Sequence, residues 1–308
     1  MCGIIGINSS KPVSATILSS LKKLEYRGYD SAGIATLSNG LINEVKSEGR
    51  VDNLEKNLLI KNMEGTIGIG HVRWATHGAP NSINAHPHSS QNVSVVHNGI
   101  IENSTLLKKF LVSKGHKFKS QTDTEVIVHL ITEYLKELNL KDAIIKTLKQ
   151  LHGSFALGVI FKDQPDLIVG ARRGSPLAVG YGPNENYLGS DSYALKSMTN
   201  KISYLDDGEF CIIKKDQIDF FNEDGLIDQV ISMGDISSGL KFFYRLPPLC
   251  YHTLLIHSEA LVFHEITNGP FKMEDTIWAP WSPDEADQNA VIQYMAALVN
   301  SIQKLITK

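Results

Sequence analysis

Short runs of apolar or alternating residues recur through the first two thirds of the chain. Runs of this length, bounded by glycine and polar residues, are typical of β-strands. We therefore expect strands at Gly3–Ile7, Ala32–Leu37, Thr66–Arg73, Val93–His97, Phe155–Phe161, Leu167–Ala171 and Phe210–Lys214.

Four other segments carry apolar residues at helical spacing, within residues 17–24, 106–111, 126–131 and 144–151. Gly28 and Gly153 are placed to end the first and last of these helices. Thr122-Asp123-Thr124-Glu125 has the form of a capping box for the third. Because the strands fall in hairpin-like groups with two adjacent helices between them, the order favours antiparallel sheets covered by helices over a doubly wound parallel sheet.

The chain changes character near residue 235, where the pattern becomes irregular. A final helix is still predicted, with Ser282 as N-cap, Pro283 at its first position and Glu285 completing a capping box. Its apolar stripe through residues 291–305 fits either a helix that packs on its own chain or one that binds a partner.

Composition narrows the class of protein. The chain has 308 residues, 42% hydrophobic and 20% charged, with a net charge of −3, so bulk charge gives no reason to expect nucleic acid or membrane partners. Three separated cysteines without a CxxC pair imply neither a disulfide framework nor a thiolate zinc site. No signal peptide or apolar run of membrane-spanning length is found. We expect a cytoplasmic protein.

Cys2 is the most informative residue. If an aminopeptidase removes Met1, Cys2 carries a free α-amine beside its own thiol, so one residue supplies both nucleophile and base. A thiol pKa of ~8.5 and an α-amine pKa of ~7.7–8.0 make proton transfer between them nearly balanced. Taken alone, a cysteine at position two is far more often a buried or merely tolerated residue than a nucleophile.

Other polar residues have a joint chemical interpretation with Cys2. The Asn98 amide and the Gly99 N–H are donors suited to an oxyanion, while Arg73 and Asp123 suit the carboxylate and ammonium of an amino acid. Each residue alone has a simpler explanation. Asn98-Gly99 is typical of a type I′ turn, Asp123 of a helix cap and Arg73 of a surface ion pair.

His86, His88 and His97 raise the question of a metal site. His86-Pro87-His88 places two imidazoles two residues apart, on one side of an extended segment. No glutamate or cysteine stands at a recognised ligand spacing nearby, and loop histidines are more often hydrogen-bonded than metal-bound. We expect no metal and no cofactor.

Read together, seven stretches resemble the glutaminase (class II glutamine amidotransferase) domain of the glucosamine-6-phosphate synthase family, the isomerising glutamine–fructose-6-phosphate aminotransferases. Order and spacing match over roughly residues 2–235. The stretches are Met1-Cys2-Gly3-Ile4-Ile5-Gly6, Leu24-Glu25-Tyr26-Arg27-Gly28-Tyr29-Asp30-Ser31-Ala32-Gly33, His71-Val72-Arg73-Trp74-Ala75-Thr76-His77-Gly78, Asn84-Ala85-His86-Pro87-His88, Val95-Val96-His97-Asn98-Gly99-Ile100-Ile101-Glu102-Asn103, Thr122-Asp123-Thr124-Glu125 and Gly174-Ser175-Pro176-Leu177.

The resemblance implies an α+β N-terminal nucleophile hydrolase fold, a four-layer αββα sandwich of two antiparallel sheets. It implies that Cys2 attacks the side-chain amide of L-glutamine, forms a γ-glutamyl thioester and releases glutamate and ammonia. Asn98 and Gly99 then match the oxyanion hole, and Arg73 and Asp123 match the clamp for the glutamine carboxylate and ammonium. The further substrate-binding positions that it implies are Arg27, Thr76, His77 and Trp74, the last also matching the residue that gates ammonia passage.

One departure limits this expectation. The family continues into two sugar-isomerase domains, and nothing in residues 236–308 resembles their start. We therefore divide the chain into a glutaminase domain at 2–235 and a divergent tail at 236–308. This chain should make ammonia without itself making glucosamine 6-phosphate, and a synthase/isomerase subunit in trans is one expected partner. The alternatives are a non-catalytic fragment or scaffold, or a glutaminase subunit for another acceptor.

Overall fold

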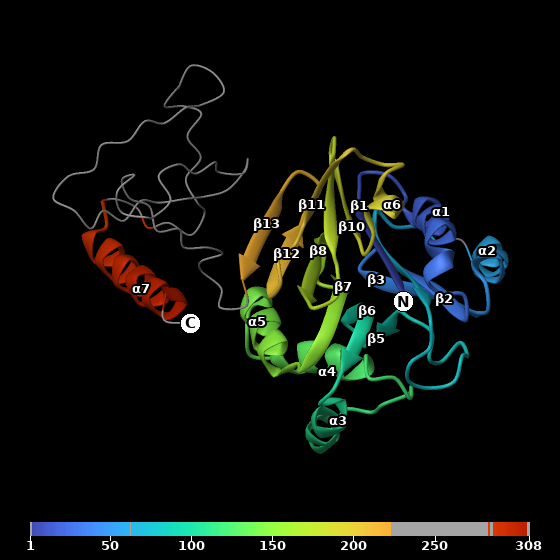
Figure 1. Cartoon of the computed structure of the whole chain (residues 1–308), viewed down its shortest axis with the longest axis horizontal. Coiled ribbons are helices and arrows are strands. Elements are labelled where there is room, and N and C mark those ends of the chain that lie inside the picture. The colour runs from blue at the N-terminus through green and yellow to red at the C-terminus, as the bar shows by residue number, and fades with distance from the viewer. Residues whose placement is uncertain (1, 62, 223–282, 284–285, 307–308) are drawn as a thin grey trace, which may run out of the picture. The chain divides into compact units, whose positions relative to one another are not determined.

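The computed structural model describes residues 2–61, 63–222, 283 and 286–306 (Figure 1). The chain divides into two compact units, Met1–Asp228 and Gln229–Lys308. In the first unit the described strands form two sheets, and every pairing between named strands is antiparallel. The sequence-based boundary at residue 235 stays a prediction.

The first sheet has seven strands, with the chain's first strand at its centre. Because that strand is covered on both faces, all six of its residues are buried, which explains its continuous apolar run. The strand order is β11 (Lys201–Tyr204), β9 (Ala178–Gly182), β10 (Glu185–Gly189), β1 (Gly3–Asn8), β4 (Ile67–Arg73), β2 (Ser31–Ser38) and β3 (Leu41–Glu48).

The second sheet has six strands and contributes the other half of the sandwich. Its order is β13 (Ile218–Asn222), β12 (Glu209–Ile213), β8 (Gln164–Arg173), β7 (Gly153–Phe161), β6 (Val93–Ile101) and β5 (His88–Ser89).

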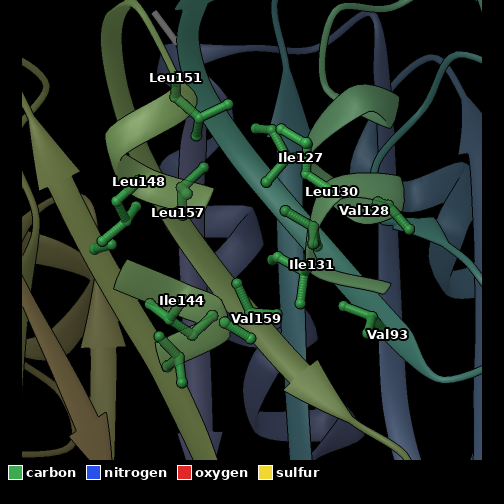
Figure 2. Close-up of a cluster of buried hydrophobic side chains, with 14 of the residues drawn as sticks. Val93, Ile127, Val128, Leu130, Ile131, Ile144, Leu148, Leu151, Leu157 and Val159 are labelled. Carbon is green, nitrogen blue, oxygen red and sulfur yellow. The ribbon is translucent and has the colours of Figure 1, made fainter. Parts of the chain in front are cut away.

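Helices cover the outer face of each sheet, as Figure 1 shows. On the first sheet lie α1 (Ser14–Leu24), α2 (Val51–Ile60) and α6 (Ser192–Leu195), which share one buried cluster with its strands. On the second lie α3 (Ser104–Ser113), α4 (Glu125–Tyr134) and α5 (Leu140–Gln150), which share another buried cluster with its strands. Figure 2 shows part of this cluster, where α4 and α5 pack on β6 and β7. The predicted helix–sheet–sheet–helix layering is therefore confirmed.

A third cluster lies between the two sheets and holds them face to face. Ile4 of β1 and Ile69 of β4 meet Val96 of β6 and Ile160 of β7 there, and all four side chains are fully buried. Alternation along β4 and β6 sends one face to this cluster and the other to the helices. Burial of these apolar faces is the main favourable contribution to folding, and it holds the start of β1 against β6.

Three local predictions are wrong. Gly28 does not end α1, which ends at Leu24 and is followed by a 3₁₀ turn, η1 (Glu25–Arg27). A Cβ on Gly28 would lie 2.5 Å from the Arg73 carbonyl carbon, so the glycine permits close approach of this turn to β4. Gly153 begins β7, after α5 has ended at Gln150.

The capping box at residues 122–125 is the third error. Thr124 precedes the first residue of α4 without a side-chain cap, and the Glu125 carboxylate instead accepts hydrogen bonds from the Lys119 and Ser120 backbone N–H groups, at 2.8 and 2.7 Å. The carboxylate thus fixes the segment before the helix rather than capping it.

The final helix exists but begins later than predicted. Helix α7 spans Gln288–Ile306, and Asp287 caps it by accepting a hydrogen bond from the Ala290 N–H at 3.0 Å. Pro283 lies outside the helix, while the predicted caps Ser282 and Glu285 lie outside the described residues. Among the helices that the structure describes, none has the length and apolar character needed to cross a bilayer.

Helix α2, which the sequence reading missed, offers a direct test of the packing. Leu54 is fully buried against the first sheet, whereas Leu59 on the same helix is 83% exposed. Leu54→Ala should lower the free energy of unfolding by about 2–5 kcal/mol, because it leaves a cavity. Leu59→Ala should change it by less than about 0.5 kcal/mol. Denaturant unfolding followed by circular dichroism measures both, and equal effects would contradict this packing.

Candidate active site at the start of the first strand

Cys2 lies directly before β1 and beside the end of β4. The β1–β4 register pairs Gly3 with Val72, which brings Cys2 alongside the chain that follows Arg73. The Trp74 N–H donates to Cys2 Sγ at 3.2 Å, and the thiol lies 3.5 Å from the Trp74 carbonyl oxygen. Burial raises the pKa of the Cys2 thiol, while the Trp74 N–H acts to lower it. The thiol is therefore partly buried but faces a backbone donor that would stabilise its thiolate.

Two side chains hold the carbonyl oxygen of Cys2. Asn98 Nδ2 donates to it at 3.0 Å from β6 in the second sheet. Arg27 Nε donates to it at 3.0 Å from the turn after α1. Cys2 is thus held from both sides of the sandwich. Asn98 and Arg27, both predicted site residues, lie next to it for this reason.

The Asn98 amide is itself oriented by a buried histidine. His71 Nε2 lies 3.0 Å from Asn98 Oδ1 and 3.0 Å from the His97 carbonyl oxygen. Because both neighbours are acceptors, we assign the hydrogen to Nε2. Burial lowers the pKa of His71 to about 3, so the ring is neutral at neutral pH. His71 thereby directs the NH₂ group of Asn98 toward Cys2.

Asn98 and Gly99 lie inside β6, so both the predicted end of the strand at His97 and the alternative type I′ turn are wrong. The ladder with β7 continues through both residues to Ile101, and Gly99 pairs with Phe155. Gly99 has a φ of 126°, and a Cβ there would lie 2.0 Å from the Ser154 carbonyl oxygen. Glycine lets the strand turn its backbone here without interrupting the sheet.

Asp123 is buried near the end of the same strand. Its Oδ2 accepts a hydrogen bond from the Ile101 N–H at 2.7 Å. Within the described part of the chain, Oδ1 has no hydrogen-bond partner. The interpretation of Asp123 as a simple helix cap is therefore wrong, because its carboxylate is joined to β6, two residues beyond Gly99.

Arg73 is 3% exposed and holds the loop that follows β4. Its guanidinium donates to the carbonyl oxygens of His77, Gly78 and Ala79, with distances of 3.3 Å to Gly78 and 3.4 Å to Ala79. Asp30 lies 3.9 Å away. Arg73 is thus not the surface residue that its type alone suggests.

The remaining predicted substrate residues lie on this exposed loop. Trp74 is 49% exposed and packs edge-on against Tyr29, with ring centroids 5.4 Å apart. Thr76 and His77 are exposed, and His77 Nδ1 lies 3.4 Å from Thr76 Oγ1. Arg73 holds this part of the loop through its hydrogen bond to the His77 carbonyl oxygen. The structure therefore brings Cys2, Asn98, Arg27 and the Trp74 backbone together, with Thr76 and His77 at the rim.

Four buried histidines lie behind these residues. The rings of His71 and His86 stack at 4.3 Å, and His86 meets His88 edge-on at 4.8 Å. His86 Nε2 and His97 Nδ1 both face Thr124 Oγ1, at 2.8 and 2.9 Å. Hydroxyl groups are thus the partners of His86 and His97, whereas the partners of His71 are an amide and a backbone carbonyl oxygen. In the part of the chain that is described, no group of three or more His, Cys, Asp or Glu side chains has the arrangement of a metal site.

Sequence reasoning missed two supporting residues: His71, which orients the Asn98 amide, and Asp191, which accepts a hydrogen bond from Arg27 at 2.8 Å. His71 stands in one of the matched stretches, but its contact with Asn98, like that of Asp191 with Arg27, arises only in the folded chain. The sequence does offer one indication for His71: a histidine within the buried strand β4 needs a polar partner nearby.

Known proteins resemble this chain in sequence and in fold. A sequence profile described as the glutamine amidotransferase domain matches residues 72–197. The chain contains a glutamine amidotransferase domain. The isomerising glutamine–fructose-6-phosphate aminotransferase of Mesorhizobium japonicum is 52% identical over 226 residues, which are 73% of this chain and 37% of that relative. The corresponding protein of Zymomonas mobilis is 48% identical over 239 residues, 77% of this chain and 39% of that relative. This chain spans little more than a third of these curated relatives.

A solved structure supports the fold assignment. Glutamine phosphoribosylpyrophosphate amidotransferase from B. subtilis superposes with a TM-score of 0.63 and 28% identity, covering 72% of this chain and 49% of that chain. The predicted N-terminal nucleophile fold is therefore confirmed for this glutamine amidotransferase domain.

Two glycine substitutions test the geometry beside Asn98. Gly99 and Gly115 both have positive φ, but a Cβ on Gly115 would meet nothing within 4 Å. Gly115→Ala should cost about 1–2 kcal/mol from backbone strain alone. Gly99→Ala should cost clearly more, because the methyl group collides with backbone that cannot rotate away. Denaturant unfolding compares them, and equal losses of stability would contradict the close approach of β6 to Ser154.

The buried histidines predict a pH dependence of stability. Burial lowers the pKa of both His71 and His88 to about 3, whereas an unfolded histidine has a pKa of ~6.5. Between these values the unfolded chain binds more protons, so acid favours unfolding. The free energy of unfolding should fall as the pH drops from about 6.5 to 5, with at most about 1.4 kcal/mol per pH unit from each histidine.

Urea unfolding at a series of pH values measures this slope. His88→Gln removes one titrating ring and should make the slope shallower. His152→Gln, at an exposed position, is the matched control and should leave the slope unchanged. A slope that is identical in all three proteins would contradict the assignment of a neutral His88 ring in the folded state.

Proposed function

We propose that this chain hydrolyses the side-chain amide of L-glutamine through Cys2, after loss of Met1. The α-amine of Cys2 takes the thiol proton, and the thiolate attacks the amide carbon. When the tetrahedral intermediate collapses, the C–N bond breaks and the α-ammonium returns the proton to the departing ammonia. Water then attacks the γ-glutamyl thioester, releasing glutamate and the thiol.

The observation that carries this proposal is the pairing of Cys2 with Asn98 across the sandwich. Nδ2 of Asn98 has two hydrogens, and one is used on the Cys2 carbonyl oxygen. The other, with the backbone N–H of Gly99, would donate to the substrate oxygen that becomes negatively charged when Sγ adds to the amide carbon. Donors held rigidly before the reaction starts stabilise this charge without reorganisation, and His71 and the β6–β7 ladder provide that rigidity here.

Asp123 and Arg73 would hold the amino-acid end of glutamine. The buried Asp123 carboxylate keeps Oδ1 available for an ammonium group, and its place near Gly99 supports this role. Arg73 now donates to neutral loop carbonyls. A substrate carboxylate would compete well with them, because a charge-assisted bidentate pair is the stronger interaction. Trp74, Thr76 and His77 are proposed to complete the substrate site, and Arg27 to support it by holding the Cys2 carbonyl oxygen.

We further propose that the ammonia is delivered to fructose 6-phosphate held by a synthase/isomerase subunit in trans. The names of the relatives, which are aminotransferases of fructose 6-phosphate, support this acceptor. Glucosamine 6-phosphate formation on adding a sugar-isomerase polypeptide to this chain with glutamine would test it. The expected cytoplasmic location stays a prediction.

The hydrolysis itself is tested by substituting the cysteines. Cys2→Ala should abolish ammonia release from glutamine, because it removes the nucleophile. Cys211→Ala, at a buried position in β12, should retain activity and serves as the control. A coupled glutamate assay measures the rates, and intact mass shows whether Met1 is removed.

Processed wild-type protein that binds glutamine but releases no ammonia would contradict the proposal and favour the alternative of a non-catalytic module. Activity that survives Cys2→Ala would assign the reaction to a different nucleophile.

A further inference from the structure

Asp191 lies at the end of β10, next to the beginning of β1. The preceding residue, Ser190, pairs with Ile4 in both directions: its N–H donates to the Ile4 carbonyl oxygen at 3.1 Å, and its Oγ accepts from the Ile4 N–H at 2.9 Å. Asp191 is therefore carried by a segment bonded to the strand that begins one residue after Cys2.

Both carboxylate oxygens of Asp191 are used. Oδ2 accepts hydrogen bonds from Arg27 Nη1 at 2.8 Å and from the Tyr26 hydroxyl at 2.5 Å. Oδ1 accepts from the Tyr193 N–H at 2.9 Å, which caps α6. Burial acts to raise the pKa of Asp191, but the hydrogen bonds from Tyr26, Tyr193 and Arg27 outweigh it and hold the pKa below the usual value. The carboxylate is therefore charged at neutral pH and cannot rotate without breaking a bond.

Arg27 transmits this constraint to Cys2. Its side chain is only 9% exposed, with Nη1 on Asp191 and Nε on the Cys2 carbonyl oxygen. The planar guanidinium fixes the angle between these two bonds. Arg27 is thus better described as a group that holds the nucleophile's backbone than as one that contacts substrate.

We propose that Asp191 is a positioning residue for the N-terminal nucleophile, acting through Arg27. This inference rests on the proposed function. The Cys2 carbonyl has one donor from Asn98 and one from Arg27, and together they fix the rotation of the residue that bears both the thiol and the α-amine. Misplacement by about 1 Å can cost about 10²-fold in rate. Asp191 therefore affects turnover without touching glutamine.

A purely structural role is the competing explanation, because Asp191 also caps α6. Asp191→Ser separates the two roles: serine is a good N-cap and can still accept from the Tyr193 N–H, but it is too short and uncharged to hold Arg27. Asp191→Asn keeps the shape and loses only the charge. Glu55→Ser, which breaks the exposed ion pair with Lys22 on the same side of the sandwich, is the matched control.

The kinetic experiment measures kcat and KM for glutamine in the full chain. Asp191→Ser should lower kcat by about tenfold and leave KM within about twofold. This pattern shows that the substitution slows turnover without weakening substrate binding. Asp191→Asn should lose less, and Glu55→Ser should match the wild type. In an Arg27→Lys background, Asp191→Ser should have little further effect, because both changes break the same connection. An unchanged kcat in Asp191→Ser, or losses that multiply in the double variant, would overturn the proposal.

Hydrogen exchange gives a readout that does not depend on glutamine. Asp191→Ser should speed exchange by at least about threefold in the peptides covering residues 2–6 and 25–28, with α6 at 192–196 unchanged. Faster exchange confined to α6 would assign Asp191 a capping role alone and overturn the proposal. If the wild type releases no ammonia but exchange changes as expected, the proposed function fails while the positioning of Cys2 by Asp191 stands.

Discussion

The carbonyl oxygen of Cys2 is the point on which the site depends. It accepts hydrogen bonds from Asn98 in one sheet and from Arg27 in the turn that supports the other, both at 3.0 Å. Once Met1 is removed, as we propose, no preceding chain would hold Cys2, and these two side chains would fix its carbonyl group. The apolar cluster between the two sheets keeps these donors at a fixed separation. The two-sheet architecture thus holds the backbone of Cys2, the proposed nucleophile, from both sides.

Next to Asn98 and Arg73, a group of four buried histidines is kept uncharged. His71, His86, His88 and His97 are buried together, and desolvation lowers the pKa of each of them. Neutral rings can donate with one nitrogen and accept with the other, which suits partners such as the Asn98 amide and the Thr124 hydroxyl. A charged ring next to Arg73 would instead repel the guanidinium that the proposed clamp needs. The buried histidines therefore orient polar side chains such as the Asn98 amide, but they make the folded protein less stable in acid.

Much of the fold was readable from the sequence, because apolar periodicity is a local signal. Strands β1, β4, β7 and the helices α1, α3 and α5 were found where the pattern placed them. The more exposed β3, the short α6 and the amphipathic α2 were missed, since their apolar residues are few or interrupted. The end of β6 was misjudged for a specific reason: Asn98-Gly99 is a strong turn signal, and only pairing with β7, more than fifty residues further on, overrides it. Among the site residues, Cys2, Asn98 and Arg73 stood out by type and motif. Asp191 and His71 did not, because their importance lies in contacts between segments far apart in sequence.

The most direct test of the central claim is to trap the covalent intermediate. Wild-type protein is mixed with glutamine, quenched in acid within the first turnover, digested and mapped by mass spectrometry. The account predicts a γ-glutamyl adduct on the sulfur of a peptide that begins at Cys2, with no residue before it. An adduct on another residue, or on Cys2 in a chain that still carries Met1, would contradict the claim that the terminal cysteine acts as its own base.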